Sequence, residues 1–116
     1  MVEHLTKQTF LDKVFNYEQN QEWKFEGQLP CIIDFYADWC GPCRMVAPVM
    51  EEMVKTFGEK VIIGKVDVDA NAAVAGKYGV MSIPTVILFN HGEEVVRQVG
   101  FGGKEIYEEM INKAIK

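Results

Sequence analysis

The chain has 116 residues but only three cysteines. So small and odd a number does not provide the disulfide framework of a small secreted domain. A chain of this length can also bury a sizeable core without covalent staples. We therefore interpret Cys31, Cys40 and Cys43 as thiols kept for reactivity rather than as structural cross-links.

Basic side chains are in the minority, with 12 Lys and Arg against 17 Asp and Glu and a formal net charge of −5. The sequence contains no cluster of Lys and Arg residues, and a protein that binds nucleic-acid phosphates needs such a cluster. No apolar run approaches the roughly 20 residues of a spanning helix. The N-terminus also lacks the pattern of a secretory signal. We expect a cytoplasmic protein, monomeric by default, that binds neither nucleic acid nor membrane.

Hydrophobic periodicity predicts an alternation of strands and helices. We expect strands over residues 2–5, 31–37, 60–68, 85–90 and 93–100, the last two paired as a hairpin around Asn90-His91-Gly92. We expect helices over residues 7–18, 41–57 and 70–78, and a last helix after Gly103. This order predicts one domain, residues 1–116, with an α/β fold: a three-layer α/β/α sandwich around a central mixed β-sheet.

Local signals indicate where the elements begin and end, and which residues form the core. Thr6 is the expected cap of the first helix, and Gly58 and Gly79 are expected to end the next two. Residues 19–29 are predicted to form a long connection, with Trp23 and Phe25 packed onto the core. The expected core residues are Phe10, Phe15, Phe35, Phe57 and the methionines of the helix over 41–57.

The segment Trp39-Cys40-Gly41-Pro42-Cys43 lies where a predicted buried strand passes into the longest predicted helix. Side chains three residues apart at a helix start share one face, so small backbone adjustments allow a disulfide. So short a loop removes little entropy from the unfolded chain, so the disulfide stabilises the fold only weakly. Such a bond is better suited to reversible oxidation and reduction than to holding the fold together. The helix N-terminus favours a thiolate on Cys40, and we expect Cys43 to be more buried. Pro42 suits the first turn, where no N–H is needed.

This segment resembles the active-site signature of the thioredoxin family, and the similarity extends over most of the chain. Asp34 lies at the family's buried acidic position and Lys65 at its strand lysine. Ile83-Pro84-Thr85 resembles the loop whose proline is cis in the family. Further matches are the helix proline Pro48 and the glycines Gly92 and Gly100.

The chain departs from the family pattern in three places. Tyr36 stands where a second tryptophan is often found, and Cys31 is an additional thiol, expected to be a small buried residue. The connection after the first helix is longer than in the shortest members. None of these differences involves the cysteine pair.

The resemblance implies the fold of the family and a two-step exchange mechanism. Cys40 attacks a substrate disulfide, and Cys43 then displaces the reduced substrate. Asp34 accepts the proton of Cys43, because burial raises the pKa of a carboxyl group, and Lys65 pairs with Asp34 to limit that rise. The resemblance implies no cofactor in the chain itself. It implies protein disulfides as substrates and an NADPH-dependent thioredoxin reductase as the partner that recharges the dithiol.

The resemblance also implies a substrate site around the cysteine pair. A cis bond before Pro84 turns the Ile83 backbone toward the sulfurs, where a substrate strand can pair with it. The substrate would pack on an apolar patch around this backbone. The residues expected to bind substrate are Trp39, Gly41, Pro42, Ile83, Pro84 and Gly100, with Val99 and Phe101 as further apolar contacts.

Plainer interpretations of these residues stay open from the sequence. Cys40 and Cys43 form half of a zinc site in one of them, although the remaining thiol and the two histidines lack paired ligand spacing. Asp34 can be a structural buried acid, Lys65 a solvated strand end and Trp39 an ordinary packing residue.

Two rival functions also stay open. A disulfide oxidase or isomerase would run the chemistry in the opposite direction, but such relatives usually carry histidine where this chain has Gly41-Pro42. A binding scaffold would make the thiols incidental. Insulin reduction distinguishes an active dithiol from a scaffold, and the redox potential fixes the direction of exchange.

Overall fold

The computed structural model describes residues 2–14, 29–91 and 93–115, without the side chain of Lys13. The strands are β1 (Glu3–Leu5), β2 (Cys31–Tyr36), β3 (Ile62–Asp67), β4 (Thr85–Asn90) and β5 (Glu93–Val99). The helices are α1 (Lys7–Lys13), α2 (Cys43–Phe57), the short 3₁₀-helix η1 (Gly58–Lys60), α3 (Ala72–Lys77) and α4 (Lys104–Ile115).

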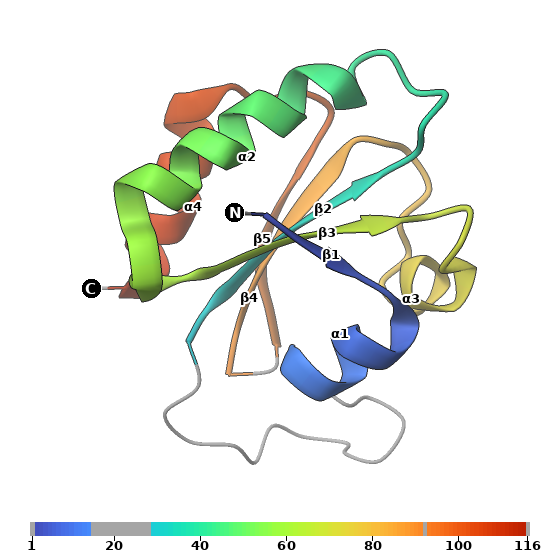
Figure 1. Ribbon diagram of the computed structural model, residues 1–116, viewed down its shortest axis with the longest axis horizontal. Helices are drawn as coiled ribbons and strands as arrows, with labels where there is room; N and C mark the ends of the chain where they lie inside the picture. Colours follow the sequence, from blue (N-terminus) through green and yellow to red (C-terminus); the bar gives the residue numbers. More distant parts are fainter. Residues whose placement is uncertain (1, 15–28, 92, 116) are drawn as a thin grey trace.

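These strands form one mixed sheet in the order β1-β3-β2-β4-β5. β1 and β2 run parallel to β3, whereas β4 is antiparallel to both β2 and β5. Helices α2 and α4 cover one face of the sheet, and α1 and α3 cover the other (Figure 1). The predicted three-layer α/β sandwich with a mixed sheet is confirmed.

Most predicted boundaries hold within a few residues. Thr6 caps α1: its hydroxyl accepts the Thr9 N–H at 3.3 Å, and the Thr9 hydroxyl accepts the Thr6 N–H at 2.8 Å. The long helix begins at Cys43 rather than at residue 41, because Gly41 and Pro42 form the turn that leads into it. β3 begins later than predicted because η1 extends the end of α2.

Several predictions lie outside the described residues and are not tested. These are the end of the first helix beyond residue 14, the connection over 19–28 with Trp23 and Phe25, the core position of Phe15, and the turn glycine Gly92.

Strand β2 is central to the core because both of its faces are covered. Ile32 packs with Met50 and Met53 of α2 in one cluster, whereas Ile33 packs with Phe10 of α1 in the other. Alternate side chains of a strand point to opposite faces, so one apolar strand supplies both layers. This is the physical reason why the segment is mostly apolar and shows no alternation of apolar and polar residues, with Asp34 as its charged exception.

The predicted core is confirmed for Phe10, Phe35, Met50 and Met53, and Phe57 is partly buried against it. The prediction is wrong for Met45, which is 54% exposed. The buried side of α2 is formed by positions 43, 46, 50 and 53, and residue 45 lies off this stripe.

None of the helices in the described part of the chain has the length and apolar character needed to cross a bilayer.

The two methionines of α2 provide a matched test of the packing. Met53→Ala should lower the free energy of unfolding by about 2–5 kcal/mol, because it removes a fully buried side chain and leaves a cavity. Met45→Ala on the exposed side should change it by less than about 0.5 kcal/mol. Urea unfolding followed by circular dichroism measures both. Equal losses in the two variants would contradict this assignment of the helix faces.

Candidate active site

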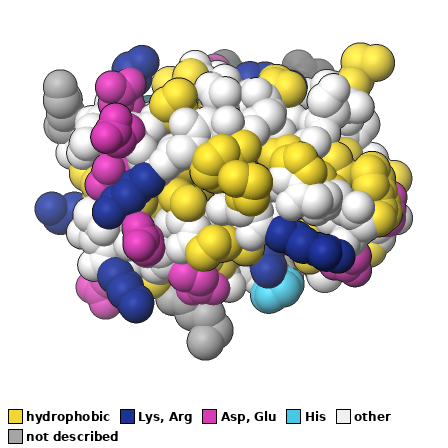
Figure 2. Space-filling view, turned by 90° about the horizontal axis from the view of Figure 1, so that it is seen from above, with side chains coloured by type: hydrophobic (Ala, Val, Ile, Leu, Met, Phe, Trp, Pro, Cys, Tyr) yellow, Lys and Arg dark blue, Asp and Glu magenta, His cyan; other side chains and the backbone are white. Residues whose placement is uncertain are grey.

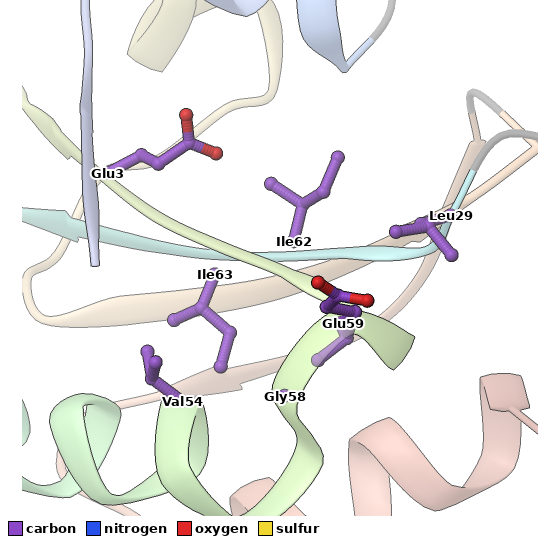
Figure 3. Close-up of a pocket in the computed structure, with 8 residues that line it drawn as sticks. Glu3, Leu29, Val54, Gly58, Glu59, Ile62 and Ile63 are labelled. Atoms are coloured by element: carbon purple, nitrogen blue, oxygen red, sulfur yellow. The ribbon is translucent and has the colours of Figure 1, made fainter. Parts of the chain in front are cut away.

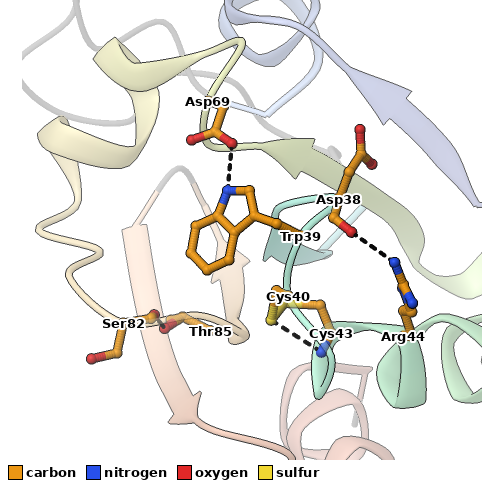
Figure 4. The surroundings of a disulfide bond; sticks show 8 residues. All are labelled: Asp38, Trp39, Cys40, Cys43, Arg44, Asp69, Ser82 and Thr85. Carbon is orange, nitrogen blue, oxygen red and sulfur yellow. Dashed lines mark hydrogen bonds between the residues drawn. A yellow bond between two sulfur atoms is a disulfide. The ribbon is translucent and has the colours of Figure 1, made fainter.

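Cys40 and Cys43 are joined by a disulfide, with their Cα atoms 5.3 Å apart. Cys40 lies in the turn after β2, and Cys43 is the first residue of α2 (Figure 4). The predicted closeness of the two sulfurs at the strand-to-helix junction is confirmed. The pair packs against Ala37, with Ile83 and Val68 at the edge of the same cluster.

Hydrogen bonding distinguishes the two cysteines. The Cys43 N–H, at the start of α2, donates to the Cys40 sulfur at 3.2 Å (Figure 4). The N–H groups of the first helical turn have no partners inside the helix and carry its positive end, so they favour an anion beside them. This arrangement favours a thiolate on Cys40 when the pair is reduced.

Burial does not distinguish the cysteines. The prediction that Cys43 is more buried is wrong for this disulfide-bonded state, because both residues are 4% exposed. Cys40 is covered through its contacts with Ala37 and the neighbouring cluster. Gly41 and Pro42, between the cysteines, are exposed.

Trp39 is 71% exposed, but its ring is held in place. Its indole N–H donates to a carboxylate oxygen of Asp69 at 2.8 Å (Figure 4). Arg44 of α2 donates to the Asp38 carbonyl oxygen at 3.2 Å and thereby ties this turn to the helix. Asp69 was not among the predicted site residues. Its position just past β3, beside the parallel strand β2, is the sequence signal that could have identified it, because parallel strands end at the same edge.

The loop before β4 lies beside the disulfide. The Ile83–Pro84 peptide bond is cis, as predicted, and Ile83 contacts the cysteine cluster. The Gly100 N–H donates to the Pro84 carbonyl oxygen at 2.8 Å, and the Thr85 hydroxyl donates to the Ser82 carbonyl oxygen at 2.5 Å. The first bond connects the loop to the residue after β5, and the second closes the loop onto the start of β4.

Large apolar side chains remain exposed on the molecule. Val99 and Phe101, predicted as contacts, are 55% and 40% exposed. Met81, two residues before Ile83, is 95% exposed and was not predicted. Figure 2 shows hydrophobic side chains gathered across the middle of the face seen from above, with charged side chains around them. An exposed apolar surface bordered by polar groups is typical of a protein-binding region.

Asp34 is a nearly inaccessible carboxyl group, 2% exposed, in the middle of β2. Its Oδ1 has no hydrogen-bond partner among the described residues. Burial raises the pKa of Asp34 to about 7, and the charge of Lys65 acts in the opposite direction. Asp34 shares its sheet face with Ile32, and thus with α2, because residues two apart on a strand point the same way.

Lys65 lies directly opposite Asp34 in the β2–β3 register. Its ammonium nitrogen is 5.2 Å from the ring centroid of Tyr36, within the range of a cation–π contact. The structure therefore brings Lys65 beside Asp34, as predicted, and places Tyr36 as a second neighbour of its charge.

Cys31 is separate from this site. It is 2% exposed, packs in the α1–α3 side of the core, and donates its thiol hydrogen to the Leu29 carbonyl oxygen at 3.6 Å. Burial, and to a smaller extent the charge of Glu3, raises its pKa to about 12. These properties are those of the small buried residue that was predicted.

A hollow of about 700 Å³ lies near the end of α2 and the start of β3 (Figure 3). Its lining combines apolar side chains, such as Val54 and Ile62, with the carboxylates of Glu3 and Glu59. None of the predicted site residues lines it. Across the described residues, no group of three or more His, Cys, Asp or Glu side chains is arranged to hold a metal ion.

Comparison with known proteins agrees with this geometry. The family model described as Thioredoxin matches residues 2–113. Thioredoxin of Bacillus subtilis is 54% identical over 82 residues, which are 71% of this chain and 79% of that protein. Thioredoxin of Borreliella burgdorferi is 38% identical over 107 residues, 92% of each chain. A point mutant of thioredoxin from Halobacterium salinarum matches with a TM-score of 0.78 and 34% identity, over 98% of this chain and 90% of that one.

The fold, the cysteine pair at the start of α2 and these relatives lead to one conclusion. The chain belongs to the thioredoxin family and is a thiol–disulfide oxidoreductase.

Proposed function

We propose that this oxidoreductase is a general protein disulfide reductase in which Cys40 attacks and Cys43 resolves. The observation that supports this order is the hydrogen bond from the Cys43 N–H to the Cys40 sulfur. The thiolate is the nucleophile in disulfide exchange, and the thiol beside an unpaired helix N–H ionises more readily.

The reaction has two exchange steps. The Cys40 thiolate attacks one sulfur of the substrate disulfide, and the other substrate sulfur leaves as a thiolate. The Cys43 sulfur then attacks Cys40 and expels the first substrate sulfur. The substrate gains two electrons and two protons, and the protein is left with the Cys40–Cys43 disulfide that the structure contains.

Asp34 fits the role of proton acceptor for Cys43 in the second step. A carboxyl group whose pKa is about 7 exchanges a proton readily near neutral pH. Its uncompensated Oδ1 lies on the sheet face that α2 covers. Lys65, opposite it in the register, stabilises the ionised form and keeps the pKa from rising further.

The direction of exchange follows from the dipeptide between the cysteines. Gly41 and Pro42 carry no charge that would stabilise the reduced pair. A strong oxidant owes its high potential to a stabilised reduced form. We therefore propose a low potential and reductive turnover. This turnover needs a compartment that keeps thiols reduced, the cytoplasm, and an NADPH-dependent thioredoxin reductase that regenerates the dithiol.

Substrate binds, in this proposal, by strand pairing with the Ile83 backbone. Trp39, fixed by its bond to Asp69, and the exposed side chains of Val99, Phe101 and Met81 provide apolar contacts for the substrate. Main-chain pairing with a shallow apolar surface tolerates many sequences, as a general reductase requires.

Insulin reduction with dithiothreitol, together with the redox potential, tests the function. Cys40→Ser should abolish catalysis of insulin precipitation, and Cys31→Ala should retain it because Cys31 is buried and unreactive. The equilibrium potential of the Cys40–Cys43 pair should lie below about −200 mV. Equal turbidity rates for Cys40→Ser and the unmodified protein would favour a scaffold, and a higher potential would reverse the assigned direction.

Asp34→Asn should slow the resolution of a mixed disulfide on Cys40 by at least about tenfold near pH 7, because it removes the general base. Stopped-flow release of a chromogenic thiol from the mixed disulfide measures this rate. The difference should shrink at alkaline pH, where Cys43 ionises without assistance. An unchanged rate near neutral pH would remove Asp34 from the mechanism.

The pH dependence of the free energy of unfolding provides a control for the Asp34→Asn variant, because it tests whether Asp34 has a raised pKa independently of the reaction rate. Native Asp34 holds its proton up to about pH 7, whereas in the unfolded chain the group ionises near its usual pKa of 3.8. Stability should therefore fall as pH rises through this window and remain lowered above it. Asp34→Asn should gain relative stability over the same window, toward an upper bound of roughly 4 kcal/mol. Urea unfolding of the disulfide-bonded proteins at acidic and alkaline pH measures the gain.

A further inference from the structure

The β4–β5 hairpin contains a register shift that aligns two charged side chains. Ile87, Leu88 and Phe89 of β4 pair with Arg97, Val96 and Glu94, which leaves Val95 as an extra residue in β5. Residues three apart on a regular strand point to opposite faces. Because the bulge adds one residue, Glu94 and Arg97 face the same side, with α1 and α3.

In this alignment the Arg97 guanidinium binds both the Glu94 carboxylate and the Tyr78 carbonyl oxygen, an arrangement that we call the clamp. Its Nε and Nη2 donate to the two carboxylate oxygens of Glu94, each at 2.5 Å, in a forked arrangement. The Nη2 group also donates to the carbonyl oxygen of Tyr78 at 2.6 Å. Both charged side chains are 29% exposed, so the pair is partly shielded from solvent. Glu94 thus fixes the guanidinium that reaches Tyr78.

Tyr78 marks the point where α3 ends and the loop over residues 79–84 begins. Its ring packs against Phe10 and Phe89, with centroid distances of 5.5 Å and 4.9 Å. Gly79 follows with a φ of +64°, and the Val80 N–H closes the turn on the Ala75 carbonyl oxygen. Arg97 therefore binds a carbonyl at the end of the helix, on a residue that the core already holds.

The other end of the same loop is attached to β5 as well. The Gly100 N–H donates to the Pro84 carbonyl oxygen at 2.8 Å. The segment over residues 79–84, which carries Met81 and Ile83, is thus held by Arg97 at its start and by Gly100 at its end. A loop fixed at both ends has fewer conformations to lose when a substrate orders it.

We propose that Arg97 is a positioning residue for substrate recognition: by clamping the Tyr78 carbonyl, it sets the loop over 79–84 so that the Ile83 backbone meets a protein disulfide substrate. The inference rests on the proposed role of this loop in substrate binding. It assigns Arg97 and Glu94 no contact with the sulfurs. The loss of the clamp therefore affects recognition of a protein chain, and not the exchange chemistry itself.

Two substrates separate recognition from chemistry. Arg97→Gln should lower kcat/KM for insulin by about tenfold, chiefly through KM, because the loop is held in a less favourable geometry. Reduction of a small aromatic disulfide, dithiobis-nitrobenzoate, should change less than about twofold, because it does not need the loop. The redox potential should not change. Arg97→Lys should restore part of the loss, because an ammonium group also donates to a carbonyl.

Matched variants make the outcome specific. Lys113→Gln removes an exposed positive charge from the last turn of α4 and should leave both substrates unaffected. Ile83→Ala serves as the reference for the loop and should impair insulin reduction selectively. Equal losses on both substrates for Arg97→Gln, or a lowered unfolding midpoint without selective loss on insulin, would overturn the inference.

The reference variant also separates the two proposals. If Ile83→Ala impairs insulin reduction and Arg97→Gln does not, the role of Arg97 is wrong and the loop remains the substrate site. If neither variant affects insulin selectively, neither the Ile83 side chain nor the contact of Arg97 with Tyr78 contributes to substrate recognition, and the inference about Arg97 fails.

Discussion

The hydrogen bond from the Cys43 N–H to the Cys40 sulfur is the interaction on which the proposed chemistry depends. It exists because β2 ends and α2 begins within a few residues, so that an unpaired helix N–H points at a sulfur. Both elements are anchored in the core, β2 through Ile32 and Ile33 and α2 through Met50. This rigid framework therefore fixes the relative positions of Cys40 and Cys43 while the disulfide between them forms and breaks.

The surroundings of this junction combine stabilising contacts with an unfavourable one. The buried carboxyl group of Asp34, with an oxygen that has no partner among the described residues, opposes folding once it is ionised. Trp39 is kept exposed but oriented by Asp69, and the loop of Ile83 is held from β5. An exposed apolar surface and a buried carboxyl group without a hydrogen-bond partner for one oxygen are features that a structure selected for stability alone would lack.

The strand-to-helix junction could be predicted because it rests on local patterns: the mostly apolar run of β2, the periodicity of α2 and the glycine that ends it. The pairing of Asp34 with Lys65 followed from a family resemblance and agrees with the sheet register. Other features depend on geometry that a single sequence does not express. The equal burial of Cys40 and Cys43 results from tertiary contacts. The alignment of Glu94 with Arg97 requires a β-bulge, and no turn residue in the sequence indicates where that bulge lies.

Differential alkylation of the reduced protein tests the central claim most directly. A brief exposure to iodoacetamide near pH 7, followed by peptide mass spectrometry, compares the labelling of Cys40 and Cys43. Cys31 is the internal reference, because burial raises its pKa to about 12. We predict that Cys40 is labelled at least about tenfold faster than Cys43, since the helix N–H lowers the pKa of its thiol. Equal labelling, or faster labelling of Cys43, would contradict the account.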